Sequence, residues 1–148
     1  MAALEEVRDH IETLIETCRD GEKGFSQAAE HTKDPELRKR FLEESRVRSD
    51  FASQLEREAV NLGAKIGKTG SVAGALHRGW IDLKGKVGLD DKSILESVEQ
   101  GEDSARDAYQ EALAADLPPS LKSLVQSQFE HVQAKHDEVR RLRDARAA

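Results

Sequence analysis

Five ionisable residues lie at positions where the helical pattern of this 148-residue sequence calls for apolar side chains. They are Glu22, Glu44, Arg48, Glu102 and His136, and they are spread over four predicted helices. With a helical rise of about 1.5 Å per residue, their distances from the predicted turns place them near one level of a helix bundle. A charged side chain in a protein interior must be paired with an opposite charge or bound to a metal. The sequence therefore predicts a buried ionisable layer.

One interpretation of this layer is a carboxylate metal centre. Helix bundles with two iron or manganese ions use one Glu from each of two helices and a Glu-x-x-His pair from each of the other two. In this sequence Val47 follows Glu44 by three residues and Gln133 precedes His136 by three, so both pairs are incomplete. Four of the six ligand positions are filled, and the metal candidates are Glu22, Glu44, Glu102 and His136.

The other interpretation is a metal-free ionic network around Arg48. This residue lies one turn after Glu44 and faces inward in the same pattern, where it can pair with Glu44 or Glu22. An inward Arg supplies the positive charge that a metal would bring, and His136 can form a hydrogen bond with Glu102. We therefore expect an interior balanced by Arg48, with no cofactor and no catalytic residue. A single metal ion, or a working iron or manganese pair, is the alternative.

The helices that must position these residues are visible in the apolar spacing. Apolar side chains recur at steps of three and four, which is typical of amphipathic helices. Asp34-Pro35 and Pro118-Pro119 have the composition of helix starts, with a proline at the first helical position. The spacing predicts helices over residues 3–31, 35–62, 91–115 and 120–145 of a single domain, 1–148.

The connection over residues 63–90 is long and contains seven of the ten glycines. Within it, Ser71 can cap a short helix over about 71–84 that carries Trp80. Two antiparallel hairpins joined by such a crossover predict an all-α, ferritin-like four-helix bundle. A plain bundle with a loose loop is the alternative. Trp80 either covers a flank of the bundle or forms a contact with a second copy or a protein partner.

The composition excludes several functional classes. The net charge of −6 argues against nucleic acid, whose phosphates require a basic surface. We expect no membrane span, because no apolar run approaches about 20 residues. The single cysteine, Cys18, fits a reducing cytoplasm and lies on an apolar stripe, where we expect it to behave as a small apolar residue. Gly67-Lys68-Thr69 lacks the upstream glycine of a phosphate-binding loop, and we expect His10, His31 and His131 at the surface.

Residues 14–25, 70–80 and 101–103 resemble a proteobacterial four-helix-bundle family of unknown function that is grouped in the ferritin-like superfamily. The stretch Gly-Ser-Val-Ala-Gly-Ala-Leu-His-Arg-Gly-Trp, residues 70–80, is the most specific part. The resemblance implies a ferritin-like fold and a cytoplasmic bacterial protein, without an assigned activity or cofactor. We expect a structural or stress-associated binding protein rather than an enzyme. The alternative is a carboxylate metal protein for iron or manganese storage or oxidant handling.

Overall fold

The computed structural model describes residues 4–64, 66, 79–83 and 85–146, and these contain four α-helices and no strand. The helices begin and end within two residues of the ranges expected from the apolar spacing. They are α1 (Leu4–His31), α2 (Pro35–Asn61), α3 (Asp91–Leu113) and α4 (Pro119–Asp144). Over the described residues, no helix is both long enough and apolar enough to cross a membrane.

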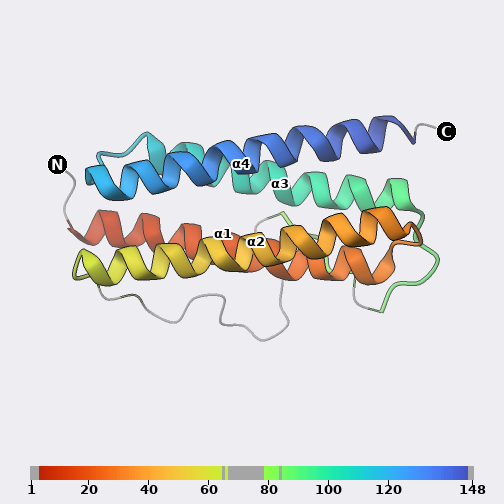
Figure 1. Cartoon of the computed structure of the whole chain (residues 1–148), viewed down its shortest axis with the longest axis horizontal. Coiled ribbons are helices and arrows are strands. Elements are labelled where there is room, and N and C mark those ends of the chain that lie inside the picture. Colours follow the sequence, from red (N-terminus) through yellow and green to blue (C-terminus); the bar gives the residue numbers. More distant parts are fainter. Residues whose placement is uncertain (1–3, 65, 67–78, 84, 147–148) are drawn as a thin grey trace.

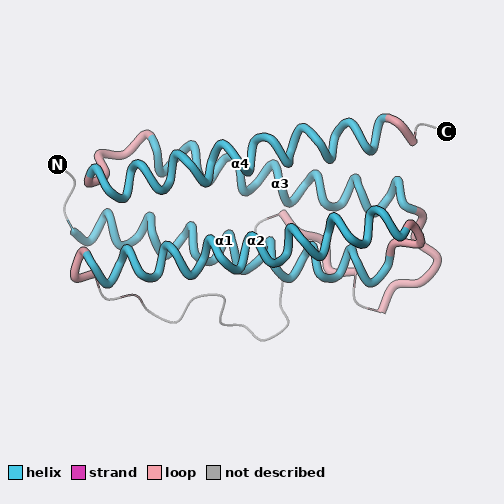
Figure 2. Tube along the Cα trace, viewed as in Figure 1, coloured by secondary structure: helices cyan, strands magenta, loops and turns pink. Residues whose placement is uncertain are grey.

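The helices form two antiparallel pairs. Figure 1 shows α1 and α4 running in one direction along the bundle, and α2 and α3 running in the other. Because α2 and α3 are parallel, α3 begins at the end of the bundle opposite to the end of α2. The two helix ends that this connection joins therefore lie at opposite ends of the bundle, whereas the α1–α2 and α3–α4 loops each lie at one end (Figure 2).

Local sequence explains where two of the helices begin. The Asp34 side chain accepts a hydrogen bond of 2.9 Å from the backbone N–H of Glu36, and Pro35 occupies the first helical position of α2. At the start of α3, the Asp90 side chain accepts a bond of 2.7 Å from the backbone N–H of Ser93. The hydroxyl of Thr32 donates to Asp91 Oδ1 at 2.6 Å, which attaches the α1–α2 turn to the first turn of α3.

The apolar interior consists of two clusters, one toward each end of the bundle. The first is centred on Ile11, Leu14, Leu55, Tyr109 and Val125. The second contains aromatic and aliphatic side chains that include Phe25, Leu37, Phe41, Ile94 and Trp80. The buried ions of the predicted layer lie between these clusters along the helices, so two apolar regions enclose a polar one.

Trp80 covers the flank formed by α1 and α3, and it is only 8% exposed. A Cβ atom added to Gly24 or Gly101 would lie 2.2 Å from the indole ring, so the two glycines form the slot that holds it. The ring of Phe25 meets the indole edge-on at 5.3 Å. Most of the short helix predicted over 71–84 lies outside the described residues. Its described part, 79–83, is not helical.

Candidate functional site

Arg48 on α2 is the centre of the buried polar layer. Its side chain is 1% exposed, and its Nε–H donates to Glu44 Oε2 at 2.8 Å. Its two terminal nitrogens donate to the two carboxylate oxygens of Glu102, each at 2.7 Å. Bidentate arginine–carboxylate pairs are roughly twice as strong as hydrogen bonds between neutral groups. Among the described residues α2 and α3 do not pack on each other, so Arg48 joins two helices across the interior.

Glu44 has a second partner, His131 of α4. The Nε2 atom of His131 lies 2.9 Å and 3.0 Å from the two carboxylate oxygens of Glu44. Burial acts to raise the pKa of Glu44, but the hydrogen bond from His131 and the charge of Arg48 outweigh it, so the pKa is lowered. His131 was expected only at the surface. Its side chain is 31% exposed and caps the layer from outside, a contact between helices that no local spacing signals.

The charges of this layer are nearly balanced without a further ion. Burial acts to lower the pKa of Arg48, but the charges of Glu102 and Glu44 raise it, so the guanidinium stays protonated. Two carboxylates and one guanidinium leave one excess negative charge. That charge lies nearest to Glu44, whose carboxylate also contacts His131, the member of the group that meets solvent.

Glu22 does not belong to the layer, so the expectation that it faces inward is wrong. Its side chain is 36% exposed, and it accepts a hydrogen bond of 3.0 Å from Arg19 on the α1–α2 flank. The inward position belongs to the preceding residue, Gly21. A Cβ on Gly21 would lie 3.2 Å from Arg48 Nη1, so the absence of a side chain there makes room for the guanidinium.

His136 is buried as expected, but it does not face Glu102. Its Nε2 atom lies 2.5 Å from Asp103 Oδ1, and its Nδ1 atom lies 3.2 Å from Asp137 Oδ1. Asp103 follows Glu102 in α3 and therefore points about 100° away from it. Of the four predicted metal ligands, only Glu44 and Glu102 share a binding partner. Both accept hydrogen bonds from Arg48.

A second buried polar chain runs beside the layer. Tyr109 donates to Gln128 Oε1 at 2.7 Å, and Cys18 Sγ lies 3.1 Å from the Tyr109 oxygen. Gln128 in turn donates to Gln54 Oε1 at 3.0 Å. Burial raises the pKa of Cys18 to about 11, more than its hydrogen bond with Tyr109 lowers it. The thiol therefore stays protonated near neutral pH and is a poor nucleophile, as predicted for a small apolar residue in the core.

Most of the residues described above lie in a region that matches a model of a protein family. A family model described as a domain of unknown function, DUF2383, matches residues 6–115. The match includes α1 from residue 6, all of α2 and α3, and the three charged residues Glu44, Arg48 and Glu102, whereas His131 and His136 on α4 lie beyond it. No curated protein matches the chain. The chain belongs to the DUF2383 family.

Proposed function

We propose that this protein is a ferritin-like four-helix bundle of the bacterial cytoplasm with a non-enzymatic, structural or stress-associated binding role. The parallel course of α2 and α3 supports this arrangement, because a single long crossover between two hairpins is the connectivity of such bundles (Figure 1). The single, buried and unpaired cysteine is compatible with a reducing compartment.

The placement of Arg48 carries the proposal. A dinuclear iron or manganese centre needs carboxylates that bridge two cations at the middle of the bundle. Here both oxygens of Glu102 and one of Glu44 accept hydrogen bonds from the guanidinium, at 2.7 to 2.8 Å. An arginine in this position supplies the positive charge for the carboxylates. Such a network favours one packing arrangement of the helices over others.

Two further buried groups, the thiol of Cys18 and the hydroxyl of Tyr109, support a non-enzymatic role. The thiol of Cys18 is kept protonated by burial, and the hydroxyl of Tyr109 is held by Gln128. Burial also raises the pKa of Tyr109 well above its ordinary value. Neither group is poised to lose a proton near neutral pH, which nucleophilic or general-base chemistry would require.

Metal loading tests the proposal. Protein purified without chelators is incubated with Fe²⁺ or Mn²⁺, desalted, and analysed for bound metal and for iron oxidation in air. Wild-type protein and the Glu102→Gln variant are expected to retain equal amounts of metal. Glu111→Gln, an exposed site on the same helix, is the control. Two ions per chain that disappear in Glu102→Gln, but not in Glu111→Gln, would overturn the proposal.

A homodimer or protein partner at residues 71–84 remains a second, separate proposal. The indole of Trp80 is engaged by Gly24 and Gly101 of its own chain, whereas the next residue, Ile81, is 40% exposed. A partner contact here would therefore use Ile81 and leave Trp80 in its slot. The molar mass of wild-type and Ile81→Ser protein, measured by sedimentation at several concentrations, tests this. Equal monomer masses at all concentrations would exclude the homodimer.

A further inference from the structure

A second ionisable cluster, separate from the Arg48 layer, lies between α3 and α4. We propose that Glu99, Asp103 and His136 form a binding site for one divalent transition-metal ion. This inference goes beyond the proposed function, since it concerns different carboxylates and one ion rather than a bridged pair. It does not depend on the contacts of Arg48.

The three side chains converge from two helices. One potential ligand atom from each lies within 4.8 Å of the others. Glu99 and Asp103 are one helical turn apart on α3, so their carboxylates project from the same face. His136 reaches them from α4, and its ring is buried with 1% exposure. Bonds of about 2.0 to 2.2 Å to a metal would place the ligand atoms about 3 to 4 Å apart, which requires only small side-chain rotations.

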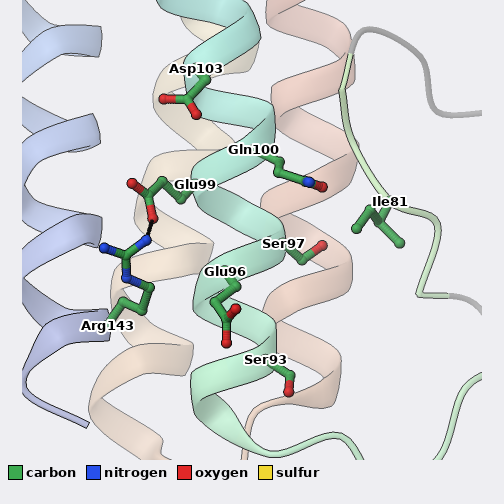
Figure 3. Close-up of a pocket in the computed structure, with 8 residues that line it drawn as sticks. All are labelled: Ile81, Ser93, Glu96, Ser97, Glu99, Gln100, Asp103 and Arg143. Carbon is green, nitrogen blue, oxygen red and sulfur yellow. Dashed lines mark hydrogen bonds and ion pairs between the residues drawn. The ribbon is translucent and has the colours of Figure 1, made fainter. Parts of the chain in front are cut away.

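A hollow gives the two carboxylates of this cluster access to solvent. It has a volume of about 410 Å³, and Glu99, Asp103 and Arg143 all line it. Figure 3 shows this hollow along α3, with Glu99 and Arg143 directed toward one another and Ile81 on the other side of the helix. Because Glu99 and Asp103 line this hollow, water molecules can complete the coordination sphere on that side, as in zinc sites with an open position.

Two arginines of α4 pair with Glu99 at the position where the proposed cation would bind. Arg143 Nη1 pairs with Glu99 Oε1, and Arg140 Nε lies 3.2 Å from Glu99 Oε2. Arg106 approaches Asp103 at 3.8 Å. The side chains of Arg143 and Arg140 are 29% and 52% exposed, so both can turn into solvent. Metal binding therefore competes with the Arg143–Glu99 ion pair.

The carboxylate of Asp137 orients the ring of His136 for metal coordination. Its Nδ1 atom faces Asp137 at 3.2 Å, while Nε2 points to Asp103 at 2.5 Å. A carboxylate on the far nitrogen is the usual outer-shell partner of a metal-bound histidine. The Nε2 atom of His136 is therefore already directed toward the proposed site.

One imidazole nitrogen with two carboxylates suits first-row divalent ions such as Zn²⁺, Co²⁺, Fe²⁺ and Mn²⁺. Zn²⁺ is the appropriate calorimetric probe, because among these four it binds tightly without redox chemistry. Co²⁺ is the spectroscopic probe, because its visible absorption reports the number and type of ligands. Both ions are added to the full chain after chelator treatment and desalting.

The experiment compares matched variants by isothermal titration calorimetry. Wild-type protein is expected to bind about one Zn²⁺, and Asp103→Asn should bind at least about tenfold more weakly. Asp107→Asn, one turn further along α3 and 70% exposed at its side chain, is the control and should bind as wild type. Arg143→Ala should bind about threefold more tightly because the competing ion pair is gone, whereas exposed Arg141→Ala should not change the affinity.

The outcome is decisive even if His136 cannot be replaced. His136→Gln should abolish the Co²⁺ spectrum, provided that its circular dichroism shows a folded helix bundle. If that variant is unfolded, the Zn²⁺ affinity of Asp103→Asn tests the inference instead. The Asp103 side chain is 46% exposed, so its replacement should not disturb folding. Equal Zn²⁺ affinity of Asp103→Asn and wild-type protein, or no saturable binding by wild type, would overturn the inference. Glu102→Gln leaves this site intact, so the test is separate from metal loading of the central layer.

Discussion

Replacement of Arg48 by methionine tests the central ion network most directly. Methionine keeps much of the length of the arginine side chain, so the change removes the guanidinium without opening a large cavity. The variant loses three charge-assisted hydrogen bonds, one to Glu44 and two to Glu102. It also loses the contact of the guanidinium with the ring of Phe25, whose centroid lies 5.2 Å away.

The loss of stability should be large because one carboxylate has no substitute partner. The Glu102 side chain is fully buried, and both of its oxygens are bonded to Arg48. Glu44 is less affected, since His131 remains at 2.9 Å. Removing one member of a buried ion pair costs about 3 to 5 kcal/mol. For a chain of this size, that corresponds to a decrease of roughly 6 to 20 °C in Tm.

Urea unfolding followed by circular dichroism measures the effect. Arg46→Met, on the exposed face of the same helix, is the matched control and should change the free energy of unfolding by less than about 0.5 kcal/mol. Adding Glu102→Leu to Arg48→Met removes the orphaned carboxylate and should recover part of the loss. A loss below about 1 kcal/mol for Arg48→Met alone would refute the reasoning, because it would mean that Glu102 reaches water or another cation.

Three further predictions concern the neighbouring contacts. Gly101→Ala places a methyl group against the ring of Trp80, so it should lower the free energy of unfolding by about 1 to 3 kcal/mol. It should also shift the tryptophan fluorescence to longer wavelength. In a Trp80→Ala background, most of this loss of stability should disappear. The pKa of Glu44 is lowered from its ordinary value of about 4.5, so its ionised form stabilises the fold above that pH, and this contribution is lost as the pH falls through the lowered value. In Glu44→Gln, the free energy of unfolding should therefore fall less steeply as the pH is lowered. An unchanged dependence on acidic pH would contradict this assignment. Tyr109→Phe leaves the carbonyl of Gln128 without its donor and should cost about 1 to 3 kcal/mol in chemical unfolding, whereas no change would indicate that water replaces the hydroxyl.

The helices themselves were predictable because their signals are local. Asp34 with Pro35 and the acid at Asp90 cap the backbone within a few residues, and the apolar spacing extends over whole helices. The inward position of Arg48 followed from the same spacing. It was detectable because an arginine among apolar positions is conspicuous.

The membership of the polar layer was predicted only in part. Adjacent helical residues differ by about 100° in direction, and the apolar stripe of α1 passes through Gly21, so Glu22 beside it was assigned to the interior incorrectly. His136 was placed correctly inside, but the rotation of α4 relative to α3 directs it to Asp103. The role of His131 depends on the approach of α4 to α2, for which the sequence contains no local signal.

The sequence by itself determined the all-helical class, the approximate helix ends and the presence of inward charges, because capping and apolar periodicity act over one or two turns. Only the tertiary structure decided which charges meet. Arg48 binds Glu102, from which it is separated by 54 positions, while Glu22 pairs with Arg19 on the flank. The ring of Trp80 likewise packs against two glycines, Gly24 of α1 and Gly101 of α3. Such contacts depend on the relative rotation and height of whole helices, which the packing of the entire core sets.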